Sequence, residues 1–220
     1  MQKIRILVAD DHRILAEGLR RLLEPTFELV AIVENGHEMI AAAKELKPDV
    51  IVADISMPLL NGIDAVSEIR SAGIQAKVIF LTMHPEAHYA RRALAAGASG
   101  YVLKHSAPSE LVFAIQQALA GQQFVTPTVV AKMNFTRAGE EASANALDEL
   151  TVRQREVLQL LAEGYSAQEI SGILKISRRT VEYHKYRIMD VLGLQKSAEL
   201  IQFAVEHGLV LQLQDPNDRR

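Results

Sequence analysis

The chain has 220 residues, of which 49% are hydrophobic and 23% charged, and its formal net charge is −3. These values are typical of a soluble globular protein, and the length suffices for one large domain or two ordinary ones. Because the sequence contains no cysteine, disulfides, iron–sulfur clusters and thiolate zinc sites are excluded. The first apolar run ends early at two aspartates, and no run of roughly 18 apolar residues follows, so we expect a cytoplasmic protein without a membrane span.

Short apolar, β-branched runs alternate with segments of helical spacing over residues 1–124. In the first such segment, Leu15, Leu19 and Leu22 recur at intervals of four and three residues. Near-continuous apolar runs suit strands buried on both faces, and parallel neighbours need crossover helices. We therefore predict an α/β, doubly wound, five-stranded parallel sheet with five helices. The expected strands are residues 4–9, 28–33, 50–53, 77–82 and 100–103.

The remaining chain divides into three segments. Residues 125–147 lose both periods and contain Pro127, which predicts a linker with a short helix near 127–135. Residues 148–212 predict an all-α, four-helix domain, because Thr151-x-x-Gln154 and Ser166-x-x-Glu169 both match the capping box of a helix start. Residues 213–220 are expected to form a solvated tail. The expected helices are residues 151–163, 167–174, 178–192 and 197–207.

Polar side chains follow four of the expected strands. They are Asp10 and Asp11 after the first strand, Asp54 after the third, Thr82 at the end of the fourth and Lys104 after the fifth. Because the carboxyl ends of parallel strands meet at one edge of a sheet, these groups should converge. Carboxylates about 4 Å apart repel by roughly 4 kcal/mol at an effective dielectric near 20. The cluster therefore needs a counter-ion, and an all-oxygen site favours Mg²⁺.

A hard cation beside a carboxylate, a lysine and a hydroxyl suits phosphoryl transfer, with Asp54 as the nucleophile. In the alternative interpretation the aspartates only cap the following helices. Capping would account for Asp10 and Asp11 but would leave Thr82 and Lys104 unexplained.

Four stretches, ILVADDH, DISMPLLNGID, FLTMH and GYVLKH, together resemble the receiver domain of bacterial two-component response regulators, a flavodoxin-like fold, over residues 1–124. The resemblance implies that Asp54 accepts a phosphoryl group from the phosphohistidine of a sensor histidine kinase. It also implies that Asp11, Asp54 and the backbone carbonyl of Ser56 bind Mg²⁺ directly, while Asp10 assists.

The same resemblance implies a switch around the phosphoryl group. Thr82 would hydrogen-bond the phosphoryl oxygens, and Lys104 would form an ion pair with them. Tyr101 matches the aromatic position that moves with the threonine in this family.

His84 and His88 stand four residues apart, a spacing that metal ligands also use. A third ligand is not found nearby in the sequence. A helix start with Pro85 in its first turn explains the pattern better than a metal site does.

Basic charge gathers in one short element of the second domain. Residues 175–187 contain five lysines and arginines against one glutamate, a local net charge of +4. A short helix and a three-to-four-residue turn precede residues 178–192, which is the pattern of a helix-turn-helix with 178–192 as the recognition helix.

We predict which side chains of this helix contact double-stranded DNA. Phosphates would be contacted by Arg179, Thr180, Lys185 and Arg187, and base edges by Glu182, Tyr183 and Tyr186. For Glu182 an ion pair with Arg178 along the helix is an equal alternative.

Residues 150–210 resemble the LuxR-type output domain, and the two halves together resemble response regulators of the NarL/FixJ group. The resemblance implies a DNA-binding transcription regulator, not an enzyme, that forms a homodimer through residues 197–207. Two alternatives are weighed. A magnesium-dependent phosphohydrolase would usually carry a second acid two residues after the nucleophile, where this chain has Ser56. A DNA-binding regulator that works without phosphorylation would not need the complete set of acidic, threonine and lysine residues.

Overall fold

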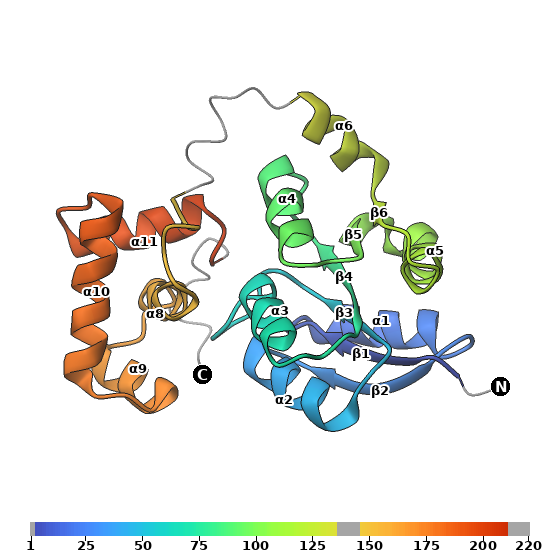
Figure 1. The fold of residues 1–220 in the computed structure, drawn as a ribbon, viewed down its shortest axis with the longest axis horizontal. Helices are drawn as coiled ribbons and strands as arrows, with labels where there is room; N and C mark the ends of the chain where they lie inside the picture. The colour runs from blue at the N-terminus through green and yellow to red at the C-terminus, as the bar shows by residue number, and fades with distance from the viewer. Residues whose placement is uncertain (1–2, 136–145, 211–220) are drawn as a thin grey trace. The chain divides into compact units, whose positions relative to one another are not determined.

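The computed structural model describes residues 3–135 and 146–210 (Figure 1). The chain divides into two compact units, residues 1–137 and 138–220, and each is described by itself. The first unit therefore extends past the boundary expected at residue 124. The expected tail, residues 213–220, and the middle of the expected linker lie outside the described residues.

A parallel sheet in the order β2-β1-β3-β4-β5-β6 forms the centre of the first unit. The five predicted strands are confirmed, but the predicted count of five was wrong, because a sixth strand pairs with β5. This strand has only two residues, too few to show a period in the sequence. The strands are β1 (Arg5–Ala9), β2 (Glu28–Val33), β3 (Val50–Ala53), β4 (Lys77–Thr82), β5 (Gly100–Leu103) and β6 (Phe124–Val125).

Helices cover both faces of this sheet (Figure 1). Alternate strand residues serve the two faces: Leu7 belongs to the core under α2, α3, α4 and α6, whereas Ile6 and Val8 belong to the core under α1 and α5. This arrangement explains why the strand sequences are apolar throughout. The helices are α1 (Arg13–Leu23), α2 (Gly36–Leu46), α3 (Gly62–Ser71), α4 (Ala87–Ala95), α5 (Ala107–Leu119) and α6 (Pro127–Phe135), and a 3₁₀ turn, η1 (Lys104–Ser106), precedes α5.

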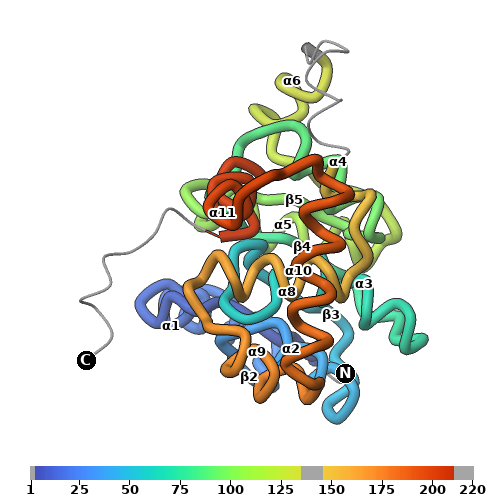
Figure 2. The backbone as a smooth tube through the Cα atoms, turned by 90° about the vertical axis from the view of Figure 1, so that its left-hand side faces the viewer, coloured from blue at the N-terminus to red at the C-terminus, as the bar shows by residue number. Residues whose placement is uncertain are grey.

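The described part of the second unit, residues 146–210, is helical, as predicted, and the four helices there lie within one residue of the expected bounds. They are α8 (Val152–Ala162), α9 (Ala167–Leu174), α10 (Arg178–Leu192) and α11 (Ser197–Glu206). Both predicted capping boxes are present, at Thr151 and Ser166. Figure 2 shows these helices in orange and red as one group, in which α10 packs against both α8 and α9. Val181 and Ile188 of α10 are fully buried, which fixes the face that α10 turns outward.

Among the residues that the structure describes, none of the helices has the length and apolar character needed to cross a membrane.

Candidate functional site

Asp10 and Asp54 continue β1 and β3 by one residue and lie at the same sheet edge. The backbone N–H of Asp10 donates to Val33 at 2.9 Å, and that of Asp54 donates to Ala9 at 2.8 Å. The two residues are only 1% and 3% exposed. The turn after Asp54 is held close by Gly62, because a Cβ there would lie 2.0 Å from the carbonyl oxygen of Asp54. The strand end and this turn together fix the Asp54 carboxylate.

Lys104 joins the two carboxylates. Its Nζ lies 2.8 Å from Oδ2 of Asp54 and 2.9 Å from Oδ2 of Asp10. Burial opposes the charge on the ammonium, but the carboxylates of Asp54 and Asp10 outweigh that effect and raise the pKa of Lys104. The lysine is therefore a fixed cation within the cluster.

Asp54 is a carboxylate in an unusual environment. Burial, the largest effect, raises its pKa from 3.8 to about 6, although Lys104 acts in the opposite direction and Asp10 adds to the rise. The backbone N–H of Ser56 also hydrogen-bonds this carboxylate. At neutral pH Asp54 is still mostly ionised, and it has little water around it.

The acidic cluster has a donor set that fits a divalent cation. One ligand atom from each of Asp10, Asp11, His12 and Asp54 can be chosen so that all lie within 4.8 Å of one another. Asp11 is partly exposed, with a side chain 34% accessible, so water can complete the coordination that Mg²⁺ prefers. Carboxylate oxygens dominate the set, and this composition fits Mg²⁺.

His12 was not singled out in the sequence, and the structure places it against both acidic neighbours. Its Nδ1 lies 2.9 Å from Oδ1 of Asp11 and 3.2 Å from Oδ1 of Asp10. The only signal in the sequence was its position directly after the two aspartates.

Thr82 and Tyr101 both form hydrogen bonds with the backbone of His84, a residue that the sequence suggested only as a candidate metal ligand. The backbone N–H of His84 donates to Oγ1 of Thr82 at 3.2 Å, and the Tyr101 hydroxyl donates to the carbonyl of His84 at 2.7 Å. Nε2 of His84 is hydrogen-bonded to Oγ of Ser56 at 2.7 Å. Tyr101 is buried, and its burial raises the pKa of its hydroxyl, which therefore remains a donor. His84 thus links Thr82, Tyr101 and Ser56 by hydrogen bonds.

The helix that would start at Pro85 begins two residues later, at Ala87, with Glu86 as its N-cap. His84 instead packs its ring on Tyr89, with 4.3 Å between ring centroids. Among the described residues, His84 and His88 belong to no cluster of metal ligands.

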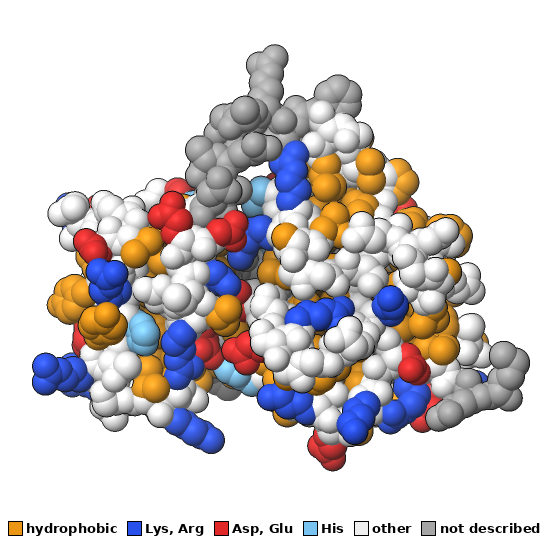
Figure 3. All heavy atoms as spheres, viewed as in Figure 1, with side chains coloured by type: hydrophobic (Ala, Val, Ile, Leu, Met, Phe, Trp, Pro, Cys, Tyr) orange, Lys and Arg blue, Asp and Glu red, His pale blue; other side chains and the backbone are white. Residues whose placement is uncertain are grey.

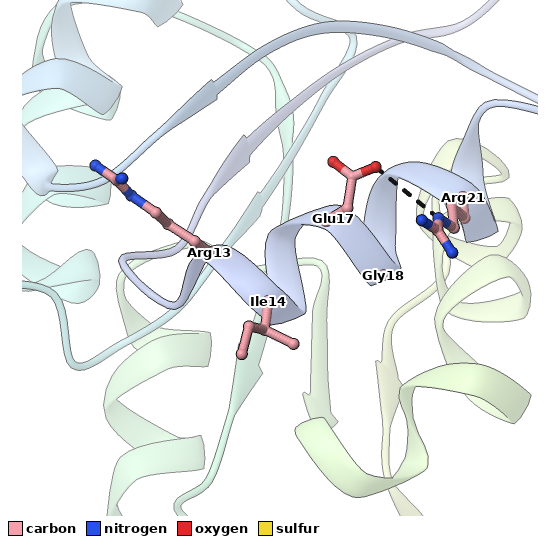
Figure 4. Close-up of a pocket in the computed structure, with 5 residues that line it drawn as sticks. All are labelled: Arg13, Ile14, Glu17, Gly18 and Arg21. Atoms are coloured by element: carbon pink, nitrogen blue, oxygen red, sulfur yellow. Dashed lines mark ion pairs between the residues drawn. The ribbon is translucent and has the colours of Figure 1, made fainter.

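A shallow groove of about 430 Å³ lies along α1 (Figure 4). Arg13, Ile14, Glu17, Gly18 and Arg21 line it. Figure 4 shows these side chains directed away from one another, apart from an ion pair between Glu17 and Arg21. Reacting groups therefore do not converge in this groove.

The outward face of α10 carries the side chains predicted to contact DNA. Tyr183 and Tyr186 are 60% and 65% exposed, and Figure 3 shows hydrophobic and basic side chains next to each other over α10. Arg179 is also exposed, Thr180 and Lys185 are half-buried, and Thr180 shares a hydrogen bond with Ser177, the N-cap of the helix. Nζ of Lys185 lies 6.0 Å from the ring centroid of Tyr186.

Two charged residues of this helix differ in their pairing. Arg187 donates to Asp190 at 3.0 Å, so part of its charge is already compensated. Within the described part of the chain, Glu182 forms no ion pair with Arg178, so the alternative of a pair along the helix is not observed.

Comparisons with known proteins match both units. The response regulator receiver domain matches residues 6–116, and the LuxR family of bacterial regulatory proteins matches residues 148–204. The chain is 36% identical over 213 residues to the transcriptional regulatory protein YxjL of Bacillus subtilis, covering 94% of this chain and 98% of that protein. It is 31% identical over 209 residues to the response regulator GacA of Pseudomonas aeruginosa, with 94% and 98% covered.

Solved structures agree with these matches. The response regulator RcsB of Salmonella typhimurium superposes with a TM-score of 0.64 at 28% identity, covering 94% of this chain and 99% of that one. A complex of RcsB with DNA superposes with a TM-score of 0.58 at 26% identity, with 94% and 99% covered. The chain belongs to the response regulators that join a receiver domain to a LuxR-type DNA-binding domain, and its relatives are transcription regulators of the NarL/FixJ type.

Proposed function

We propose that Asp54 receives a phosphoryl group from a sensor histidine kinase and that this modification controls promoter binding by the second unit. The observation that carries the proposal is the position of Lys104, whose ammonium lies within 2.9 Å of carboxylates at the ends of two neighbouring strands. In the reaction an Asp54 oxygen forms a bond to phosphorus as the phosphorus–nitrogen bond of the phosphohistidine breaks, and the leaving imidazole keeps the electron pair.

Asp10, Asp11, Asp54 and the backbone carbonyl of Ser56 would hold Mg²⁺. The cation would neutralise charge on the phosphoryl oxygens. The burial of Asp54 removes water from the nucleophile, and the backbone N–H of Ser56 orients its carboxylate.

Phosphorylation changes the partners of the neighbouring side chains. Lys104 can leave the carboxylate of Asp54 and pair with a phosphoryl oxygen, and the Thr82 hydroxyl can donate to another. A phosphoryl group adds a charge of about −1.5 to −2 at neutral pH, which supplies the driving force for this exchange. Because Thr82 and Tyr101 both hydrogen-bond to the backbone of His84, a movement of Thr82 can be transmitted to Tyr101 through His84.

The second unit would place α10 in the major groove of double-stranded DNA. Its phosphate contacts would come from Arg179, Thr180, Lys185 and Arg187. Its base contacts would come from Glu182, Tyr183 and Tyr186, and the absence of a pair between Glu182 and Arg178 leaves this glutamate available to accept from cytosine. A homodimer formed through α11 would present two such helices to a two-fold site.

The test is the intact mass of the protein after incubation with Mg²⁺ and acetyl phosphate, a small acyl phosphodonor. We expect the mass of one phosphoryl group on the wild type and none on Asp54→Ala or in the presence of chelator. Promoter binding is then measured for both forms of the wild type. A phosphoryl group that stays on Asp54→Ala would refute the assignment of Asp54, and equal DNA affinity of both forms would identify a regulator that works without phosphorylation.

A further inference from the structure

Thr126 lies between β6 and α6, outside the acidic cluster, and is only 2% exposed. Its backbone N–H donates to the carbonyl of Tyr101 at 2.9 Å, which extends the pairing of β5 with β6 by one residue. Its hydroxyl makes two more bonds. It accepts from the backbone N–H of Leu103 at 3.2 Å and donates to Oε2 of Glu110 at 2.6 Å.

The hydrogen bond to Leu103 takes the place of a backbone acceptor that β6 does not provide. Leu103 pairs with Thr82 of β4 on one side, but β6 ends at Val125 and offers Leu103 no backbone partner on the other. Leu103 is 1% exposed, so its N–H would otherwise lack both a protein partner and water. The Thr126 hydroxyl therefore fixes the last residue of β5, and the next residue is Lys104.

Glu110 of α5 sets the direction of this hydroxyl. Because Oε2 of Glu110 accepts the hydroxyl proton, an oxygen lone pair of Thr126 is left to face Leu103. The backbone N–H of Leu103 thus donates to Thr126, and the hydroxyl of Thr126 donates to Glu110. Leu103 directly precedes Lys104, whose ammonium bridges Asp54 and Asp10.

We propose that Thr126, oriented by Glu110, is a positioning residue that sets Lys104 for the phosphorylation of Asp54. The inference rests on the proposed function of Asp54. Thr126 directly precedes α6, and α6 is fixed to the first unit because Val129 is buried in the same core as Tyr101 and Arg91 of α4 donates to the carbonyl of Met133 in α6 at 2.7 Å. Thr126 therefore connects Leu103, the residue before Lys104, with the segment that leads into α6.

The experiment uses the full chain in three single variants and the wild type. Thr126→Val keeps the β-branched shape and removes the hydroxyl, and Thr126→Ser keeps the hydroxyl and removes the methyl group. Thr128→Ala is the matched control, because Thr128 is an exposed threonine two residues further along. The rate of phosphorylation by acetyl phosphate with Mg²⁺ is followed by intact mass, well below the lowest melting temperature of the set.

We expect Thr126→Val to be phosphorylated about tenfold more slowly than the wild type, since small displacements of a positioned group cost rates of this order. Thr126→Ser should restore most of the rate, and Thr128→Ala should match the wild type. A rate for Thr126→Val equal to that of the wild type would overturn the inference while leaving the role of Asp54 intact. Equal losses in the valine and serine variants would also overturn it, because packing and not the hydroxyl would then be the cause. A wild type that takes up no phosphoryl group would refute the proposed function and the inference together.

Discussion

The raised pKa of Asp54 predicts how the stability of the first unit depends on pH. Its pKa is 3.8 in the unfolded chain and about 6 in the folded one, because burial disfavours the ionised carboxylate. Well below pH 3.8 the group is protonated in both states and burial costs little. Well above pH 6 it is ionised in both states, and the shift of about two units corresponds to a destabilisation of about 3 kcal/mol. The contribution of Asp54 is therefore most favourable at low pH and is lost as the pH rises through about 6.

Asp54→Asn cannot titrate and isolates this effect. We expect the free energy of unfolding of the wild type, relative to that of Asp54→Asn, to fall by about 2 kcal/mol between pH 4.5 and 7.5. The measurement is urea denaturation followed by circular dichroism, with chelator present to keep divalent cations from the cluster. The transition that differs between the two proteins reports the first unit. A constant difference across this range would refute the reasoning, because an Asp54 with an ordinary pKa would have completed its titration largely below it.

Three further predictions concern the two units. Lys104→Met leaves buried carboxylates without their cation, so we expect a loss of about 3 kcal/mol in unfolding free energy, measured by urea denaturation with chelator. Gly62→Ala places a Cβ 2.0 Å from the carbonyl of Asp54 and should cost about 2 kcal/mol in the same assay. Arg179→Ala should weaken DNA binding for all sequences alike and reduce the salt slope of the binding constant by about 1, measured by fluorescence anisotropy.

Two of these predictions have a matched control variant. Gly18→Ala should stabilise the protein by about 0.5–1 kcal/mol, because Gly18 lies inside α1 and a Cβ there meets nothing within 4 Å. If both glycine variants lose stability equally, the close approach at Gly62 is not the cause. Arg21→Ala removes the same charge from α1 and should leave DNA binding unchanged. A stability of Lys104→Met equal to that of the wild type would mean that Asp54 and Asp10 do not need the cation.

The strands and helices of this chain could be predicted because their signals are local and repeated. Five strands have continuous apolar runs, and the helices of the second unit begin at Thr151 and Ser166 with capping boxes that the structure contains. β6 could not be predicted, since two residues have no period and their pairing with β5 depends on a partner more than 20 residues earlier in the chain.

The same limit applies to the candidate site. The edge position of Asp10, Asp54, Thr82 and Lys104 follows from strand ends, which the sequence marks clearly. The roles of His12 and Thr126 follow from hydrogen bonds whose partners are set by backbone direction in turns. The sequence contains no pattern that specifies such directions.

The strand order has a consequence for how the protein is made. In the order β2-β1-β3-β4-β5-β6, every strand from β2 onward borders at least one strand that precedes it in the chain. During synthesis the sheet can therefore grow one strand at a time as the chain leaves the ribosome, with β2 and β3 added on either side of β1 and β4, β5 and β6 added in turn at one edge. From β4 onward each new strand covers the edge left open by its predecessor, so after β3 is in place the sheet grows at one edge only, while β2 remains at the other edge.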